Sequence, residues 1–387
     1  MNMDRTGKRN LLIVTSSLAL GGAEIVISNL CRHIDRDRFD VRVCHLKERG
    51  PIGEELAGMG FDVVGVEGNR WTKANYLSFL KLRKLIRRYR VDILHSHNTY
   101  SLMDSSLCRM TLPGVKSVHT FHFGNYPHLT KKYQMAESVF CRVPDHLVAV
   151  GREQMKTLLD TFPIPEDRIS TIWNGIDRAP RDPDMEIVRR YGMGDRIIIG
   201  TIGNLIEQKG YTHLLDVAGI LKTRHPGAVF LIVGDGPLRQ GLEEKCRELG
   251  LRDTVHFLGA VKNAAARVLP LFDIFFQPSL WEAMSIVVLE AMGEGKPVLA
   301  TRVGENVHLI EEDLTGMLVD PMDVEGMAAK LGVLITDARR REELGISGRR
   351  MFERTCTAEQ MARRYEDLYL GILQGKAKAE RPVTLSK

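Results

Sequence analysis

The sequence predicts an α/β protein built from two doubly wound, Rossmann-like domains that face each other across a cleft. Short β-branched runs alternate with helical patterns along most of the 387 residues, and this alternation is typical of parallel sheets covered on both faces by helices. Several runs, such as IIIG and FLIVG, are continuously apolar, as in strands that are buried on both faces. The length exceeds the roughly 250 to 300 residues at which one hydrophobic core stops growing, so two domains are expected.

The expected strands follow one another with helical segments between most of them. In the first half they lie at 11–15, 41–46, 63–66, 93–97, 117–120 and 147–150. In the second half they lie at 197–202, 229–233, 255–258, 274–276, 298–300 and 317–319. Each half begins with a strand, a loop and a helix, which indicates two similar units in tandem.

Turn-forming residues mark the boundary between these units. The stretch NGIDRAPRDPDMEIVRRYGMGD concentrates Gly, Pro and Asp, as interdomain linkers do. Ligands of doubly wound folds bind beyond the carboxyl ends of the strands, so the cleft is the expected site. The predicted organisation is a first Rossmann-like domain at 1–178, a linker at 179–195, a second Rossmann-like domain at 196–355, a C-terminal helix at 356–371 that packs toward the first domain, and a disordered tail at 372–387.

Composition and charge exclude several classes of protein. The net charge is +5, from 54 basic and 49 acidic residues, which is too mild for a dedicated nucleic-acid binder but suits a protein that handles anionic ligands. No run approaches the roughly 20 apolar residues of a membrane-spanning helix, and the first apolar run, LLIV, is too short for a signal peptide. The six scattered cysteines form no Cys-x-x-Cys pair, so we expect a cytoplasmic protein without a disulfide framework or zinc knuckle.

The segment Pro278–Thr301, PSLWEAMSIVVLEAMGEGKPVLAT, carries the strongest functional signal. It follows the strand DIFFQ, presents Glu282 ahead of a helix and places Glu290 inside that helix. A helix N-terminus offers unpaired N–H groups to a phosphate, and a carboxylate further along can accept bonds from ribose hydroxyls. The alternative is that both are surface glutamates, with Glu282 complementing the helix dipole.

Three glycine-containing loops follow other strands. Gly203–Gly210 includes Lys209, which supplies a point charge for a phosphate; a solvated lysine in a turn is the alternative. Gly234-Asp-Gly-Pro237 is by itself only a turn, and no Gly-x-Gly-x-x-Gly spacing follows, which argues against a dinucleotide site. Gly21-Gly22 could let the backbone approach a ligand, or form a plain tight turn.

The first half also gathers histidines at strand ends. His95 and His97 lie two apart on one strand and therefore share a face. A metal site is conceivable, but core histidines are the more modest interpretation, and we expect no catalytic metal. His122 follows the strand SVHT and is predicted to be a polar group of the cleft.

Taken together, these motifs resemble glycosyltransferase family four, the retaining enzymes of the GT-B fold that include glycogen-synthase-like and mannosyltransferase-like members. The likeness runs from about residue 11 to residue 369. It rests on the order of these motifs: Gly-Gly-Ala-Glu at 21–24, Asp-Ile-Leu-His at 92–95, Thr-Phe-His at 120–122, Asn-Gly-Ile-Asp at 174–177, Lys-Gly at 209–210, Gly-Asp-Gly-Pro at 234–237, Glu282, Glu-Ala-Met at 290–292 and Gly-Lys-Pro-Val at 295–298.

The resemblance implies an activity: transfer of a hexose-type sugar from a nucleotide-diphosphate sugar to an acceptor hydroxyl, with retention, in polysaccharide or glycoconjugate biosynthesis. The resemblance assigns the acceptor to the domain at 1–178 and the nucleotide sugar to the domain at 196–355. A UDP-sugar is favoured over a GDP-sugar, and no cofactor or metal is needed. The implied catalytic residues are His122, Glu282 and Lys209. The implied donor-binding residues are Gly22, Asn204, Lys209, Gly234, Val261, Glu282, Ala283, Met284, Ser285, Ile286 and Glu290.

Two departures from the family pattern keep alternatives open. The family usually has an arginine where this chain has Asn204, and Glu282 is followed by Ala-Met-Ser285 in place of a glycine and an aromatic residue or proline. A catalytically weak or inactive sugar-nucleotide-binding partner subunit of the same fold is therefore one alternative. An NAD-dependent oxidoreductase on a doubly wound scaffold is the other.

The acceptor is indicated only indirectly, by a basic amphipathic segment, LSFLKLRKLIRRYR at 77–90. This segment could lie on anionic lipid at the cytoplasmic membrane, which would suit a lipid-linked acceptor. The alternative is an ordinary helix that packs on the sheet with its charges in water.

Overall fold

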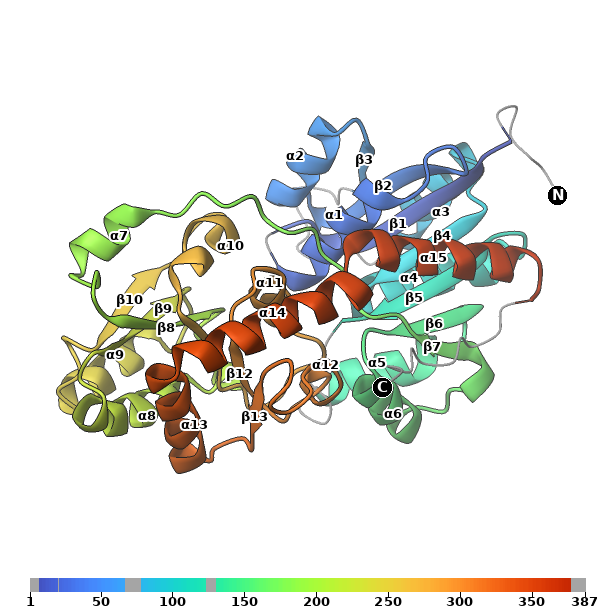
Figure 1. Ribbon diagram of the computed structural model, residues 1–387. Coiled ribbons are helices and arrows are strands. Elements are labelled where there is room, and N and C mark those ends of the chain that lie inside the picture. The colour runs from blue at the N-terminus through green and yellow to red at the C-terminus, as the bar shows by residue number, and fades with distance from the viewer. Residues whose placement is uncertain (1–6, 20, 67–77, 123–129, 377–387) are drawn as a thin grey trace. The chain divides into compact units, whose positions relative to one another are not determined.

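The computed structural model describes residues 7–19, 21–66, 78–122 and 130–376, and it divides the chain into two compact units. The first unit comprises Met1–Ile176 together with Ala358–Lys387, and the second comprises Asp177–Thr357. Each unit is an α/β structure around a parallel sheet, as the sequence predicts (Figure 1).

The first unit holds a seven-stranded parallel sheet in the order β3-β2-β1-β4-β5-β6-β7. Its strands are β1 Arg9–Ser17, β2 Phe39–Glu48, β3 Asp62–Gly65, β4 Ile93–His97, β5 Lys116–Phe121, β6 His146–Ala149 and β7 Ile169–Thr171. Its helices are α1 Gly22–His33, α2 Gly50–Gly58, α3 Ser78–Arg88, α4 Thr99–Thr111, α5 Lys131–Phe140, α6 Arg152–Thr161 and α15 Ala358–Leu373. The central strand β1 is buried on both faces, since its consecutive residues 11–14 are all apolar and all buried.

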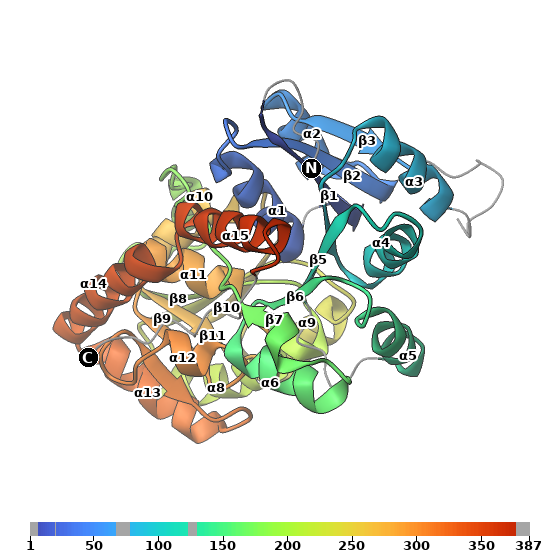
Figure 2. The ribbon, with the colours of Figure 1, turned by 90° about the vertical axis from the view of Figure 1, so that its right-hand side faces the viewer.

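The C-terminal helix α15 belongs to the first unit, where it packs against α1 (Figure 2). The carboxylate of Glu366 accepts hydrogen bonds from the backbone N–H of Asp35 at 2.7 Å and from Arg38 at 3.1 Å. The Tyr365 hydroxyl is hydrogen-bonded to the Thr120 side chain of β5, and the Tyr369 hydroxyl to the His95 ring of β4. The helix continues to Leu373, so the predicted tail begins too early at residue 372; residues 377–387 lie outside the described part.

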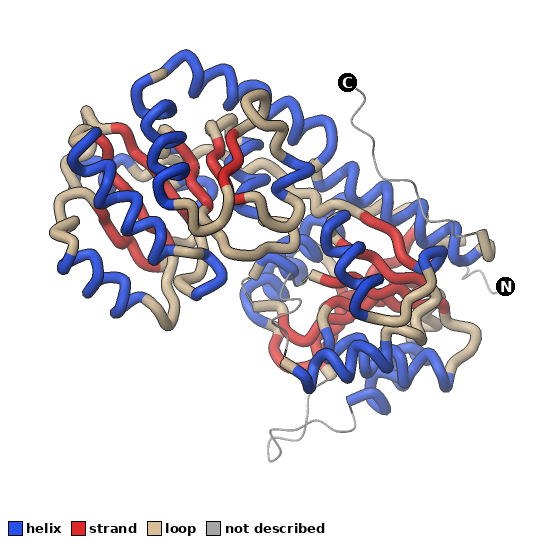
Figure 3. The backbone as a smooth tube through the Cα atoms, turned by 90° about the horizontal axis from the view of Figure 1, so that it is seen from below, coloured by secondary structure: helices blue, strands red, loops and turns tan. Residues whose placement is uncertain are grey.

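The second unit holds a six-stranded parallel sheet in the order β10-β9-β8-β11-β12-β13, with helices on its outside (Figure 3). Its strands are β8 Ile197–Ile202, β9 Ala228–Val233, β10 Val255–Gly259, β11 Ile274–Gln277, β12 Val298–Thr301 and β13 Met317–Val319. Its helices are α7 Met185–Arg190, α8 Tyr211–Arg224, α9 Arg239–Glu248, α10 Ala264–Arg267, α11 Ile286–Gly293, α12 Asn306–Leu309, α13 Val324–Thr336 and α14 Ala338–Thr355. The core joins the strand residues Ile199, Phe230 and Ile274 to Leu214 of α8 and Leu331 of α13.

The predicted linker at 179–195 is instead part of the second unit. The backbone N–H groups of Asp182 and Asp184 donate to the carbonyl oxygens of Ala266 and Arg267, at 3.0 and 2.9 Å. Within the same segment α7 forms and Met193 is buried. The Pro and Asp residues that suggested a linker therefore mark an irregular but hydrogen-bonded stretch of this unit.

Candidate active site

The loops that follow the strands of the second unit lie against one another at the carboxyl edge of its sheet. The backbone N–H of Gly234, after β9, donates to the carbonyl oxygen of Gly259 at the end of β10, at 2.8 Å. Gly234 has a φ of 136°, and a Cβ there would lie 2.0 Å from the carbonyl oxygen of Gly203, after β8. Only glycine permits this conformation and this approach, so the glycines hold three neighbouring loops together.

The loop after β8 is joined in the same way to the loop after β11. Gly210 has a φ of 66°, and a Cβ there would lie 2.0 Å from the carbonyl oxygen of Pro278. The backbone N–H of Leu280 donates to the carbonyl oxygen of Gln208 at 2.7 Å. This contact places Lys209, which ends a short 3-10 turn, beside the segment that leads into α11.

Lys209 and Glu282 form an ion pair in which Nζ lies 2.5 Å from Oε1. The Glu282 side chain is only 7% exposed, and its Oε1 also accepts a hydrogen bond from the Ser279 hydroxyl at 2.8 Å. A lysine ammonium has three N–H groups, so two remain for an anion. The structure thus brings together two residues that are 73 positions apart, both predicted to be catalytic.

The start of α11 supplies further donors. Ala283, Met284, Ser285 and Ile286 are all buried, and Ser285 is the N-cap residue but makes no side-chain capping bond. The first N–H groups of a helix have no partner within it, and together with the helix dipole they favour an anion such as phosphate. Lys209 therefore supplies a cation beside the N–H donors at the start of α11.

Glu290 lies in the second turn of α11 and is half-buried. Among the described residues, no hydrogen bond or ion pair of its carboxylate is found. Burial raises the pKa of this carboxyl group to about 7 because the low-polarity surroundings disfavour the charged form. An unpaired carboxylate of this kind could accept hydrogen bonds from a ligand's hydroxyl groups.

Asn204 and Val261 lie on the same edge of the sheet. Asn204 is exposed in the loop after β8, and its carbonyl oxygen accepts a bond from the N–H of Ile206 at 2.9 Å. Val261 is half-buried and follows β10. The predicted donor residues of the second unit thus follow one another along one edge, from Val261 through Gly234 and Asn204 to Glu282.

The remaining predicted site residues, His122 and Gly22, belong to the first unit. Gly22 is the first residue of α1. His122 follows β5, and its Nε2 lies 2.7 Å from Nδ1 of His97, with the two rings stacked at 5.0 Å. Burial lowers the pKa of His122 to about 4, so its ring is neutral at pH 7.

His95 is a core residue of the first unit. Its Nδ1 lies 2.7 Å from the Tyr369 hydroxyl and its Nε2 lies 2.8 Å from Oγ1 of Thr120, which in turn is bonded to Tyr365. Both ring nitrogens are therefore used within the protein, and neither is available to a metal. In the parts of the chain that are described, no group of three or more His, Cys, Asp or Glu side chains could hold a metal ion.

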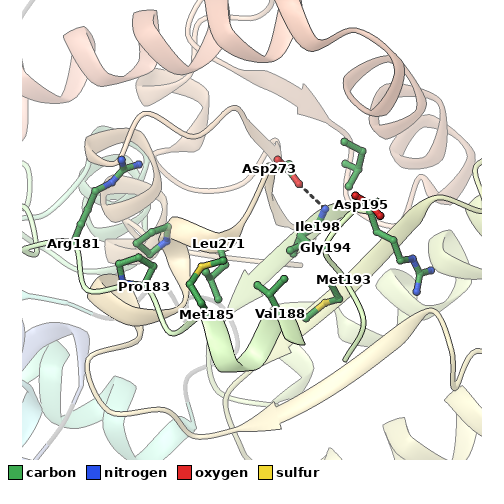
Figure 4. A pocket seen from close by; sticks show the side chains of 13 residues that line it. Arg181, Pro183, Met185, Val188, Met193, Gly194, Asp195, Ile198, Leu271 and Asp273 are labelled. Carbon is green, nitrogen blue, oxygen red and sulfur yellow. Dashed lines mark hydrogen bonds between the residues drawn. The ribbon is translucent and has the colours of Figure 1, made fainter. Parts of the chain in front are cut away.

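A separate pocket of about 560 Å³ lies at the opposite edge of the second sheet (Figure 4). It is lined by the amino ends of β8 and β11, through Ile198 and Asp273, and by Met185 and Val188 of α7. Ligands of doubly wound sheets bind at the carboxyl edge. The pocket is therefore not the expected nucleotide site.

Two buried residues near the start of α11, Gln277 and Asn306, were not predicted. Gln277 ends β11 and its Nε2 donates to the Ser285 hydroxyl at 2.6 Å; Asn306 donates to Gln277 in turn. A polar residue at the end of the apolar strand DIFFQ was a signal for Gln277. The sequence holds no comparable signal for Asn306.

Comparison with known proteins agrees with this architecture. The family model described as "Glycosyl transferases group 1" matches residues 186–351, and the one described as "Glycosyltransferase Family 4" matches residues 20–179. An Escherichia coli protein, UDP-Gal:alpha-D-GlcNAc-diphosphoundecaprenol alpha-1,3-galactosyltransferase, is 24% identical over 92% of this chain and 95% of its own length. A GDP-mannose-dependent alpha-(1-6)-phosphatidylinositol monomannoside mannosyltransferase of Mycolicibacterium smegmatis is 32% identical over 45% of this chain and 48% of its own.

Among solved structures, Anabaena HepE in complex with UDP-glucose superposes with a TM-score of 0.81 at 18% identity, over 92% of this chain and 98% of its own. This likeness shows the shared fold, two Rossmann-like domains of the GT-B type. None of the helices in the described ranges is both long and apolar enough to cross a membrane. The chain belongs to glycosyltransferase family 4, and it is a glycosyltransferase of the GT-B fold.

Proposed function

We propose that this protein transfers a hexose from a UDP-sugar to the hydroxyl group of a lipid-linked acceptor, with retention of the anomeric configuration. The observation that carries the proposal is the Lys209–Glu282 pair at the start of α11. A cation, free helix N–H groups and a carboxylate that can accept sugar hydroxyls lie together there, which matches the chemistry of a sugar diphosphate.

In the proposed reaction the bond between the anomeric carbon and the diphosphate oxygen breaks, and a bond forms from that carbon to the acceptor oxygen on the same face. The acceptor proton passes to the departing diphosphate. Lys209 and the N–H groups from Ala283 to Ile286 stabilise the negative charge that develops on the diphosphate, by fixed donors in a partly dry site. The proposal assigns this charge stabilisation to protein groups, without a metal ion.

The other predicted residues take binding roles. Glu282 holds hydroxyl groups of the donor sugar, and Glu290 holds the ribose. The loops at Gly234 and Val261 are assigned to the base, and Asn204 and Gly22 are assigned to the diphosphate. His122, neutral at pH 7, is assigned the contact with the transferred sugar.

Uridine is the preferred base for two reasons. The Anabaena neighbour was solved with UDP-glucose, and the E. coli relative that spans nearly the whole chain is named for UDP-galactose. The name of the mycobacterial relative gives GDP-mannose, so guanosine is the competing base and is included in the test below.

A lipid-linked acceptor is proposed from the same relatives, whose names give diphosphoundecaprenol and phosphatidylinositol acceptors. The exposed face of α3 fits contact with an anionic membrane surface. Its exposed residues Lys81, Lys84, Arg87 and Arg88 lie opposite the buried Leu82 and Ile86. Such a basic face is attracted to anionic lipid, which would suit peripheral association with the cytoplasmic membrane.

The test is a screen of UDP, GDP and ADP sugars by thermal shift and by turnover, with Lys209→Met as the variant. The wild type should be stabilised most by a UDP-sugar and should hydrolyse it slowly without acceptor. We expect Lys209→Met to lower kcat by about 10²-fold or more, because one fixed donor to the developing charge is lost. Lys222→Met is the matched control, since Lys222 is exposed on α8 and, within the described ranges, donates to the carbonyl oxygen of Gly250 alone.

Three outcomes would count against the proposal. Equal loss in both lysine variants would remove the assigned role of Lys209. Donor binding without any turnover or hydrolysis would favour the second candidate, an inactive sugar-nucleotide-binding subunit, which the neutral Asn204 in place of the family's arginine keeps open. No shift with any nucleotide would overturn the donor site. The oxidoreductase alternative is wrong, because the chain belongs to a glycosyltransferase family.

A further inference from the structure

A chain of buried side-chain amides connects the end of β12 to Ser285, the N-cap residue of α11. The Asn306 Nδ2 group donates to the carbonyl oxygen of Thr301 at 3.1 Å and to Oε1 of Gln277 at 3.2 Å. The Gln277 Nε2 group donates to Oγ of Ser285 at 2.6 Å. All four residues are buried, and Asn306 and Thr301 have no exposed surface.

The direction of these hydrogen bonds is fixed at one end. A backbone carbonyl oxygen can only accept, so Asn306 must turn its NH₂ group toward Thr301. Reversing Gln277 would then set two NH₂ groups against each other. Gln277 therefore presents its own NH₂ group to Ser285, and the Ser285 oxygen is an acceptor in this bond.

The Ser285 proton is consequently left for another partner. Ser285 is the N-cap residue of α11, where a serine oxygen commonly accepts a bond from an N–H of the first turn, but it makes no such bond here. None of the described residues accepts its proton. The free hydroxyl and the unpaired N–H groups of the first turn of α11 are thus donors at the same point of the chain.

We infer that Asn306 and Gln277 are positioning residues. They hold the Ser285 hydroxyl so that it donates a hydrogen bond to the nucleotide sugar, at the phosphate nearer the sugar. This inference rests on the proposed function. The phosphate nearer the sugar is the one named because Glu282, assigned to the sugar, lies only three residues before Ser285.

One atom of this amide chain is left without a partner, which indicates that the chain serves more than the stability of the core. The Oδ1 atom of Asn306 is buried and has no hydrogen-bond partner among the described residues. A buried polar atom without a hydrogen-bond partner destabilises the fold. The amide chain therefore does more than satisfy the hydrogen-bonding groups of its own members.

The test measures the dissociation constants of UDP and UMP by calorimetry for the wild type, Ser285→Ala, Gln277→Met and the double variant. Ser285→Ala should weaken UDP binding roughly tenfold, as expected for a hydrogen bond to a charged group. It should leave UMP binding within about twofold, because UMP lacks the second phosphate. Gln277→Met should also weaken UDP binding, and the double variant should be no weaker than Ser285→Ala alone.

The control is Gln154→Met, which removes another buried glutamine amide, bonded to the N–H of Val150 in the first unit. It should leave the affinity for UDP unchanged. If Ser285→Ala binds UDP normally, this inference is wrong and the proposed function is unaffected. The same holds if Gln277→Met lowers the affinity for UDP equally with and without the Ser285 hydroxyl. Failure of the wild type to bind UDP overturns the uridine donor of the proposed function, and this inference with it.

Discussion

Glu290 has a pKa that the fold has moved toward neutrality, and this makes its role testable by pH. Its carboxyl pKa is about 7 in the folded protein and near the ordinary 4.5 when unfolded. The folded state therefore binds more protons between these values, and stability falls as the pH rises from about 4.5 to about 7. Glu290→Gln should raise the free energy of unfolding at pH 8 by about 1–3 kcal/mol and give no gain at pH 4.

The same substitution should weaken donor binding, because the charged carboxylate is the better acceptor for ribose hydroxyls. We expect the affinity of the wild type for UDP-glucose to rise between pH 6 and pH 8, and that of Glu290→Gln to be lower and flat. UDP-glucose is used because its diphosphate loses no proton in this range. A variant that binds as well as the wild type, with the same pH dependence, would show that Glu290 does not touch the nucleotide.

Individual site residues could be predicted from the sequence where a short motif stands directly after a strand. Lys209 and Glu282 were each predicted from a strand-end loop, yet nothing in the sequence shows that they pair, because a contact across 73 positions depends on how the loops pack. The contact between His97 and His122 likewise depends on how two strand ends pack and could not be predicted from the sequence. Asn306 could not be found at all, since its role depends on the bond direction set by the carbonyl group of Thr301.

Among elements, the buried strands were predicted best. The bounds of β4, β8 and β13 agree residue for residue. For β8 and β13 the reason is a mostly apolar run next to turn formers, which has few other structures open to it. β7 was missed because its sequence, Ile-Ser-Thr, follows one apolar residue with two hydroxyl residues and so lacks the apolar run that marks the other short strand, β13. The stretch at 179–195 was misread as a linker, because turn formers do not show whether a loop is hydrogen-bonded to its own domain.

Helix α3 carries the prediction that belongs to the element scale. Its buried side fits the interpretation of a helix packed on the sheet, with Leu82 and Ile86 in the core beside Leu94. The exposed basic face remains available to lipid. If it contacts the membrane, replacing Lys81, Lys84, Arg87 and Arg88 by Gln should reduce co-sedimentation with vesicles rich in anionic lipid at least tenfold, since each basic residue contributes about 1 kcal/mol.

The control carries the same loss of charge elsewhere, with exposed Lys222, Arg224, Arg247 and Arg252 of the second unit changed to Gln. It should sediment like the wild type. Equal sedimentation of both quadruple variants would mean that α3 has no specific contact with lipid and that net charge alone acts.

At the scale of the whole molecule, the two units should respond to acid in opposite ways. The first unit buries histidines whose pKa values are lowered by burial, to about 3 for His119 and about 4 for His122 and His146, and further below the ordinary value for His95 and His97. A base with a lowered pKa binds fewer protons in the folded state, so stability is lost as the pH falls below about 6.5.

The second unit has the reverse balance. Because the pKa of Glu290 is raised, protonation of this residue stabilises the second unit on acidification. Within the described part of this unit, His256 is the one histidine whose pKa is lowered, through burial. In the first unit Glu24 and Asp104, whose pKa values are raised by burial, offset only part of the effect of five histidines. Each histidine can contribute about 1.4 kcal/mol per pH unit, so the histidines decide the sign.

We therefore expect acid to unfold the first unit before the second. Hydrogen exchange on the full chain, followed by mass spectrometry from pH 7 to pH 4 and corrected for intrinsic rates, should show strands β4–β6 losing protection while β8–β12 keep it. His119→Phe removes one of these titrating groups and should shift the loss in the first unit to lower pH, without moving the second. Simultaneous loss in both units, or earlier loss in the second, would show that the buried histidines do not control acid stability.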